Sequence, residues 1–451
     1  MVARRGGMKK EKQKISTFEE AERYINETPR FTTKNKIEDT AAFLERLGSP
    51  DRTMRILHVA GTNGKGSVCA YLRSILEAAG YKTALFTSPH LVDIRERFVV
   101  NGDMITKREF LNAFLRIYHL LDWEALEAGT KDAYHPTYFE FLFLIAMIIF
   151  AEKKPDFCIL ETGLGGRLDA TNAVSSKEMT IITHISLDHV EYLGESVEKI
   201  AAEKAGIMRS DVPAVCWETC PETTAVFREY ARGLGASCRF VSEKDYSFSK
   251  INTKTIDFCL YTEYYNYVTL SLHTIAAYQM ENCALAVRAI EILDRGETIG
   301  AEQIQKGVSN CFWPGRMEEV LPEVYVDGAH NEDGIRAFLD TVALDGETGR
   351  RSLLFSAVKD KDYEGMAGKL AGAGLFERIF VAPMRTGRAV SADKLEKLFE
   401  ECSDCEFAVY DTVASAFRML LESRKAGERI YVAGSLYLVG EIKELLGHDK
   451  F

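Results

Sequence analysis

Apolar and polar positions along this chain follow two periods, one typical of strands and one typical of helices. Between residues 55 and 205, short apolar runs predict strands at 56–60, 83–87, 157–161 and 180–185. The stretches between them predict helices at 67–79, 109–121, 138–151 and 197–205. Residues 17–47 have a mostly helical pattern that breaks near Thr28-Pro29-Arg30. Strands and helices in alternation indicate a parallel sheet covered on both faces.

The pattern changes between residues 246 and 273, where alternating Thr, Tyr and Val predict antiparallel strands. A predicted helix at 277–293 and the turn-prone segment 294–296 follow. A second alternation then predicts strands at 324–327, 352–356, 378–381, 406–410 and 429–433. We therefore predict two α/β domains after a polar, disordered lead at 1–16. Residues 17–296 form a doubly wound, mostly parallel domain with a small antiparallel element, and residues 297–451 form a Rossmann-like domain.

Composition and charge narrow the class of protein. Of 451 residues, 46% are hydrophobic and 27% charged, which provides a sizeable core and argues against wholesale disorder. The net charge of -11 argues against a nucleic-acid partner, but backbone dipoles still bind small anions. The longest apolar run, Phe141 to Ala151, is far shorter than the roughly 20 residues that span a bilayer. It predicts a buried helix, and we expect no membrane partner.

The ends of the chain and its cysteines indicate a cytoplasmic protein. The segment from Met1 to Lys14 is basic but lacks the apolar stretch of a secretory signal. The ten cysteines are scattered and do not resemble a disulfide framework. Cys402 and Cys405 form a lone C-x-x-C, which is either a reduced structural pair or a metal or redox site.

A phosphate-binding loop is the strongest local signal. Thr62, Asn63, Gly64, Lys65, Gly66 and Ser67 follow Gly61 between a predicted strand and a predicted helix. Glycines let backbone N–H groups approach phosphate oxygens, the helix N-terminus adds a favourable dipole, and Lys65 adds a positive charge. Gly66 stands where the common pattern has Ser or Thr, so a glycine-rich turn with an incidental lysine stays open. No guanine-specific N-K-x-D occurs, which favours ATP over GTP.

Further segments share one order with a known family. They are His58 to Ser67, Thr87 to Leu91, Glu161 to Asn172, Leu187 to His189, Tyr192 to Gly194, Ile200 to Ile207, Trp313 to Glu318, Asp327 to Asn331, Val358 to Asp362 and Gly434 to Leu438. Together they resemble the Mur ligase superfamily, specifically folylpolyglutamate synthase and dihydrofolate synthase. The resemblance extends from about Thr17 to Leu446 and therefore implies both domains.

The resemblance implies a metal-assisted reaction in which ATP activates a carboxylate. Ser88, Glu161, His189 and a carbamylated Lys204 are the implied ligands of two Mg²⁺ ions, and a monovalent cation is a further implied cofactor. A carboxylate at a strand end suits a hard cation. Locally, Ser88 also fits a turn before Pro89, His189 a hydrogen-bonded loop and Lys204 a solvated helix end.

The same resemblance implies the other sites. Asn282, Arg316 and Asp327 join the loop in binding ATP, and Lys65, Lys204, Asp169 and His330 are the implied catalytic residues. The folate or pterin residues are Thr137, Tyr138, Phe139, Glu140, Leu168, Asp169 and Ala170. Arg385, Arg388 and Ser435 are candidates for the glutamate carboxylates. Tyr138 and Phe139 also fit an ordinary core position at a helix start, because aromatic residues are usually buried.

Two positions depart from the family's pattern. His184 stands where relatives usually carry a small or amide residue, so the second metal region is expected to be tuned differently. Ala276-Ala277-Tyr278 stands where a Gly-His pair is common, which affects the expected adenine contact.

We therefore expect a monomeric, ATP- and Mg²⁺-dependent ligase that adds L-glutamate to a folate, to dihydropteroate, or to both. Two alternatives stay open. One is a Mur-type ligase acting on a UDP-sugar peptide, which usually carries a further N-terminal domain; here 60 residues precede the loop. The other is a non-catalytic module that binds a nucleotide and changes conformation.

Overall fold

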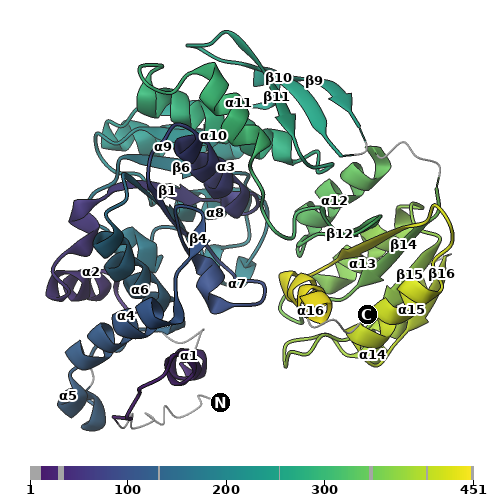
Figure 1. The fold of residues 1–451 in the computed structure, drawn as a ribbon, viewed down its shortest axis with the longest axis horizontal. Helices are drawn as coiled ribbons and strands as arrows, with labels where there is room; N and C mark the ends of the chain where they lie inside the picture. Colours follow the sequence, from purple (N-terminus) through teal and green to yellow (C-terminus); the bar gives the residue numbers. More distant parts are fainter. Residues whose placement is uncertain are drawn as a thin grey trace.

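The computed structural model describes residues 12–28, 35–130, 133–252, 254–344, 349–402 and 405–447. Two α/β lobes lie beside each other, with the first lobe in purple to green and the second in green to yellow (Figure 1). Each lobe has its own sheet, and a small third sheet extends from the first lobe. This arrangement confirms the predicted fold class.

An eight-stranded sheet forms the centre of the first lobe, in the order β4-β3-β2-β5-β1-β6-β7-β8. Its strands are β1 (Arg55–Ala60), β2 (Thr83–Phe86), β3 (Phe98–Val100), β4 (Asp103–Met104), β5 (Phe157–Glu161), β6 (Met179–Ile182), β7 (Ala214–Trp217) and β8 (Cys238–Val241). All pairs are parallel except β2–β3 and β3–β4 at one edge. Because the central strands are parallel, the loops after β1, β2, β5 and β6 leave the sheet on the same side, where α/β proteins bind ligands.

Helices cover both faces of this sheet. They are α1 (Phe18–Glu27), α2 (Ile37–Arg46), α3 (Lys65–Ala78), α4 (Lys107–Leu120), α5 (Trp123–Glu127), α6 (Tyr138–Lys153), α7 (Val190–Leu193), α8 (Val197–Ala205), α9 (Pro221–Leu234), α10 (Gln279–Asp294) and α11 (Ala301–Ser309). Helix α6 is buried along residues 140–150, as the apolar run predicts. Among the described residues, no helix has both the length and the apolar character needed to cross a bilayer.

The small sheet has the order β11-β10-β9 and is antiparallel, which confirms the predicted change of pattern. Its strands are β9 (Tyr246–Ile251), β10 (Ile256–Tyr261) and β11 (Tyr267–Leu272). Val268, Leu270 and Leu272 alternate with more exposed residues and enter the same hydrophobic cluster as α3 and α10. The small sheet is therefore an extension of the first lobe.

The second lobe is built on a six-stranded sheet in the order β12-β13-β17-β14-β15-β16. Its strands are β12 (Glu318–Leu321), β13 (Val324–Val326), β14 (Arg351–Phe355), β15 (Arg378–Val381), β16 (Glu406–Val409) and β17 (Arg429–Ala433). Its helices are α12 (Glu332–Leu344), α13 (Tyr363–Gly372), α14 (Ala392–Cys402), α15 (Val413–Glu422) and α16 (Leu436–Gly447). Only β12 pairs antiparallel.

The predicted domain boundary at 296/297 stays a prediction. Helix α11 follows it but packs on α3 and β11 of the first lobe, and the six-stranded sheet of the second lobe begins only at Glu318. Of the predicted disordered lead, residues 1–11 lie outside the described residues. In residues 12–16, the backbone N–H of Gln13 donates to the Tyr118 hydroxyl over 2.7 Å. The Cys402 side chain also lies outside the described part, while Cys405 is described and partly buried.

Candidate active site

The phosphate loop connects the carboxyl end of β1 to the first turn of α3, as predicted. Gly64 has a φ of +85° and its missing Cβ would lie 2.1 Å from Asn282 Oδ1, so both backbone and space require glycine there. Lys65 Nζ donates to the Thr62 carbonyl over 2.9 Å. Helix α3 begins at Lys65, two residues earlier than predicted, so the lysine lies at the helix N-terminus, where anions bind well.

A cavity of about 320 Å³ opens beside this loop, between the lobes. The predicted nucleotide residues on its wall are Asn63, Gly64, Ser67, Asn282, Arg316 and Asp327, and the predicted catalytic residue His330 lies there as well. Loop residues of the first lobe and residues around β13 of the second lobe thus meet at one cavity. A nucleotide bound there would contact both lobes at once.

Hydrogen bonds within the chain already fix several of these side chains. Gln279 Nε2 donates to Ser67 Oγ over 3.1 Å, and Gln279 Oε1 accepts from Asn282 Nδ2 over 3.0 Å. The Tyr278 hydroxyl donates to Asp327 Oδ2 over 2.5 Å. Tyr278, in the segment that departs from the expected pattern, therefore orients the acidic residue on the opposite lobe.

Glu161 and Ser88 lie together at the ends of neighbouring strands β5 and β2. The Ser88 backbone N–H donates to Glu161 Oε2 over 2.9 Å. Glu161 is 3% exposed, and burial raises the pKa of its carboxyl despite the opposing charge of Lys65. Among the described residues its second oxygen has no hydrogen-bond donor, so it is available to a cation.

Lys204 is buried near the C-terminal end of α8, 3% exposed, with Nζ donating to the Gly61 carbonyl over 2.7 Å. Burial, with the nearby charge of Lys65, lowers the pKa of Lys204 to about 7. The solvated alternative for this lysine is therefore wrong. A substantial fraction of the amine is neutral near pH 7, which is the form that reacts with CO₂.

His189 lies at a junction between the lobes. Lys361, from the loop after β14, pairs with Asp188 Oδ1 over 2.5 Å and has its Nζ 3.1 Å from His189 Nε2. Burial lowers the pKa of His189 to about 4, so this imidazole is neutral near pH 7 and can act as a metal ligand. In the described ranges, no three His, Cys, Asp or Glu side chains cluster as a metal site by themselves.

His330 is also neutral. Its Nδ1 lies 2.8 Å from the Gly328 carbonyl, and burial, with the charge of Lys361, lowers its pKa to about 4. Nδ1 therefore carries the proton and donates it to that carbonyl, which leaves Nε2 as the accepting nitrogen.

The predicted folate residues flank the glycine-rich loop after β5. Asp169 is buried and accepts four hydrogen bonds, from the N–H groups of Gly163, Leu164 and Thr171 and from the Thr171 hydroxyl. Its carboxylate is thus saturated, and its observed task is to shape the loop. Leu168, by contrast, is 49% exposed next to it.

Several side chains at the start of α6 also have hydrogen-bond or packing partners within the chain. Thr137 and Glu140 form a capping box, and Glu140 Oε2 also accepts from Asn35 Nδ2 over 2.7 Å. Phe139 packs against Gly163, where a Cβ would lie 2.6 Å from the ring. Tyr138 is buried, and Ala170 begins the short helical turn after Asp169.

The predicted glutamate residues lie in the second lobe. Arg385 pairs with Glu441 and Glu444, and Arg388 pairs with Asp360. Ser435 is buried and its Oγ accepts from the Tyr437 N–H over 3.2 Å. A glutamate carboxylate would therefore have to displace carboxylates of this same lobe.

The chain matches two known domain families. Residues 59–290 match the Mur ligase middle domain, and residues 315–436 match the glutamate ligase domain of Mur ligases. The dihydrofolate synthase/folylpolyglutamate synthase of Bacillus subtilis is 34% identical over 440 residues, covering 96% of this chain and 100% of the relative. The chain belongs to the folylpolyglutamate synthase/dihydrofolate synthase family of Mur ligases.

Other members of the family agree. The Escherichia coli dihydrofolate synthase/folylpolyglutamate synthase is 31% identical over 421 residues, covering 91% of each chain. A solved structure of E. coli FolC in complex with DHPP and ADP has a TM-score of 0.83, with 29% identity and coverage of 97% and 99%. Mycobacterium tuberculosis folylpolyglutamate synthase complexed with ADP has a TM-score of 0.86, with 25% identity and coverage of 96% and 98%.

Four residues at this site were not among the predicted site residues: Glu281, Asn331, Asp333 and Lys361. Asn63 Nδ2 donates to Asp333 Oδ2 over 3.0 Å, and Asn331 Nδ2 donates to Asn63 Oδ1 over 3.0 Å, so the lobes touch at the phosphate loop. His184 lies 3.2 Å from Glu281 and 3.3 Å from Asp333. Asn331 and Lys361 belong to matched segments, which could have indicated them, whereas Asp333 has no such signal.

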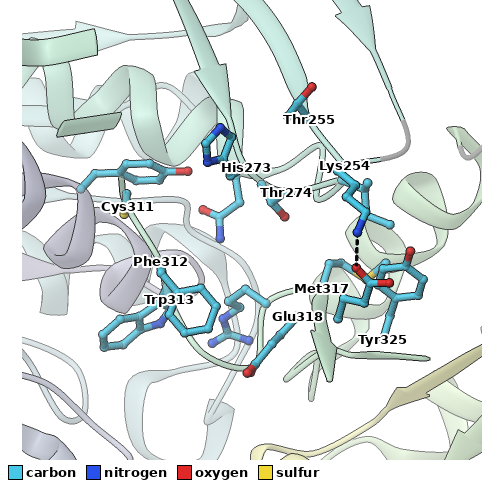
Figure 2. Close-up of a pocket in the computed structure, with 15 residues that line it drawn as sticks. Lys254, Thr255, His273, Thr274, Cys311, Phe312, Trp313, Met317, Glu318 and Tyr325 are labelled. Atoms are coloured by element: carbon cyan, nitrogen blue, oxygen red, sulfur yellow. Dashed lines mark hydrogen bonds and ion pairs between the residues drawn. The ribbon is translucent and has the colours of Figure 1, made fainter. Parts of the chain in front are cut away.

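A second, larger cavity of about 510 Å³ lies at the connection between the lobes (Figure 2). Phe312 and Trp313 of the connecting segment lie on one side of it, and Lys254 pairs with Glu319 over 3.3 Å on the other. Arg316 lies on the wall of both cavities.

Proposed function

We propose that this chain joins L-glutamate to a folate with ATP as the energy source. It is an ATP-dependent, amide-forming ligase of the folylpolyglutamate synthase/dihydrofolate synthase family. One observation carries the proposal: residues of both lobes line a single cavity at a phosphate loop, with a buried carboxylate beside that loop.

The proposed reaction has two steps. A carboxylate oxygen of the folate attacks the γ-phosphorus of ATP, the bond to the β-phosphate breaks, and ADP leaves. The amine of glutamate then attacks the acyl carbon and forms the amide bond. The bond between the acyl carbon and the phosphate oxygen breaks, phosphate leaves, and the nitrogen loses a proton. Lys65 and the N–H groups of the loop hold the phosphates in the first step, and Arg316 adds positive charge from the other lobe. Neutral His330, with Nε2 free to accept, is the proposed proton acceptor.

Mg²⁺ is the proposed cofactor, and the residues present fit it. Glu161, Ser88 and the carbamate of Lys204 would offer oxygen, and neutral His189 would offer nitrogen, for two ions. When bound, these ions neutralise phosphate charge. The buried Lys204 amine supports carbamylation because it is partly neutral near pH 7. A monovalent cation is a further proposed cofactor.

We assign the folate to the surface around Leu168, Asp169, Ala170 and residues 137–140, and glutamate to Arg385, Arg388 and Ser435. We further propose a monomer that works in the cytoplasm. The cysteines from Cys69 to Cys311 that the structure describes are free thiols, which suits a reducing compartment.

A substrate panel tests the proposal. Dihydropteroate, tetrahydrofolate and a UDP-sugar peptide are offered separately with ATP, Mg²⁺ and L-glutamate, and products are identified by mass. We expect glutamate to be added to at least one of the two pteridines. Addition to the UDP-sugar peptide alone would favour the Mur-type alternative. Phosphate release that ignores both substrates would favour a nucleotide-binding module.

A further inference from the structure

At Gly66 the need for glycine has a different cause from that at the other glycines of the phosphate loop. Its backbone is not in the left-handed region that favours glycine, since only Gly61 and Gly64 of this loop have positive φ. A Cβ at Gly66 would instead lie 2.8 Å from Cζ2 and 3.0 Å from Nε1 of Trp313. The space that the Ser or Thr of the common loop would take is therefore occupied by an indole ring.

Trp313 belongs to the segment that connects the lobes, between the end of α11 at Ser309 and the start of β12 at Glu318. Its contact joins this connection to the first turn of α3, the turn that carries Lys65. Ser67 follows Gly66 in this turn, and its hydroxyl accepts a hydrogen bond from Gln279. The first turn is thus supported by Trp313 and Gln279, while Lys65 keeps its place beside Thr62.

The same short segment also carries Arg316. Only Pro314 and Gly315 separate Trp313 from Arg316, so the ring that contacts the loop and the guanidinium on the wall of the nucleotide cavity move with one piece of backbone. Phe312, Trp313 and Arg316 of this segment also line the 510 Å³ cavity, where Phe312 is 58% exposed (Figure 2). The segment therefore borders open space as well as the loop.

We infer that Trp313 is a positioning residue that couples the arrangement of the lobes to the phosphate loop. With its ring against Gly66, the first turn of α3 and Lys65 stand in the geometry that holds the phosphates, and Arg316 reaches the same cavity. When the lobes separate, the segment moves toward the open cavity and the loop loses this support. The inference rests on the proposed role of the loop in binding ATP.

The first test compares Trp313→Ala, Trp313→Phe and Phe312→Ala, the last being an aromatic control from the same segment whose ring is 58% exposed. We expect Trp313→Ala to raise the Kd and KM for ATP by about 10- to 100-fold, the usual size of a small misplacement in a site. Trp313→Phe should retain much of the ATP affinity that Trp313→Ala loses. Phe312→Ala should change the Kd and KM for ATP less than about twofold. The unfolding midpoint of each variant is measured in parallel.

An equal effect of both alanine variants, or a lowered unfolding midpoint with unchanged ATP binding, would show a merely structural ring and overturn the inference. Failure of the wild-type protein to bind ATP would instead refute the proposed function. The two failures are thereby distinguishable.

The second test is a double-mutant cycle with Gly66→Ala. The added methyl group should weaken ATP binding strongly when Trp313 is present and have little further effect in Trp313→Ala, since the ring that it meets is gone. If the effects of Gly66→Ala and Trp313→Ala on ATP binding were simply additive, the contact between the two residues would not matter for binding, which would contradict the inference. In a protein that retains only Trp313 (W123F/W217F), ATP should change the tryptophan fluorescence, and an unchanged spectrum would argue against the coupling.

Discussion

At the scale of single residues, burial and existing partners decide what a predicted side chain can do. Lys65 and Lys204 are the same residue type, but only Lys204 is buried, and burial lowers its pKa to about 7. Asp169 and Glu161 are both buried carboxylates, yet Asp169 has four donors and Glu161 has one. Glu161 therefore keeps capacity for a cation, whereas Asp169 organises the loop around it.

Lys65→Ala should remove ligation while leaving the fold intact. The side chain is partly exposed and makes one hydrogen bond, to the Thr62 carbonyl, so the loss falls on phosphate binding. We expect kcat/KM to fall about 100- to 1000-fold, as for loss of one preorganised donor. Steady-state kinetics and thermal unfolding, with Lys82→Ala as an exposed control, measure both effects. Normal turnover would remove Lys65 from the reaction.

Lys204→Ala should lose activity by about 10- to 100-fold or more, because the proposed carbamate supports the metal. Small carboxylates such as acetate or formate should restore part of it by filling the same space. Lys199→Ala, on an exposed position of the same helix, serves as the control. Mass analysis of the wild-type protein under CO₂ should find a carbamate on Lys204; a free amine alone would speak against carbamylation.

At the scale of elements, three of them meet at His184: the loop after β6, helix α10 through Glu281, and helix α12 through Asp333. Burial opposes the charged form, but the hydrogen bond and charge of Glu281, together with Asp333, raise the pKa of His184 above its ordinary value of 6.5. Arg336 acts weakly in the other direction. The contact between the lobes therefore depends on pH.

Because the folded-state pKa is the higher one, the stability that His184 contributes is fully present below about pH 6.5. It is lost as pH rises through the raised value. We expect the unfolding free energy to fall between pH 6.5 and pH 9 more steeply in the wild-type protein than in His184→Gln. Urea unfolding at several pH values gives both curves, and parallel curves would exclude an ionised His184 at the junction.

At the scale of the whole molecule, the nucleotide cavity exists only because two lobes meet. Asn63 reaches Asn331 and Asp333 across the junction, and Lys361 reaches Asp188. The phosphate loop belongs to the first lobe, whereas Arg316 lies in the connecting segment and Asp327 follows β13 of the second lobe, so the site is completed when the lobes approach each other.

Arg316→Ala should raise the KM for ATP about 10- to 100-fold, which corresponds to the roughly 1.5–3 kcal/mol of a hydrogen bond to a charged group. The effect on the folate KM should be smaller, because the guanidinium lies at the nucleotide cavity. Arg350→Ala, an exposed arginine of the same lobe paired with Glu377, is the control. If the kinetics of Arg316→Ala match those of the control, Arg316 does not act on ATP.

Much of the fold could be predicted from the sequence, because period and local chemistry act over a few residues. Strands β5, β15 and β17 and helix α8 have the predicted bounds. The edge strands β4, β8 and β12 and the short strands β3 and β7 are not among the predicted strands. Their runs of two to four residues are too short to show a period, and pairing with a neighbouring strand is what makes them regular.

The sequence by itself determined the phosphate loop, the order of the motifs, the family and the division into βα alternations. Only the tertiary structure decided which of the named side chains remain available. It saturated Asp169, paired Arg385 with Glu441, placed Trp313 in the space above Gly66 and set His184 between the lobes. The reason is physical: a residue's type is local, whereas its burial, charge and partners depend on segments that meet only when the chain is folded.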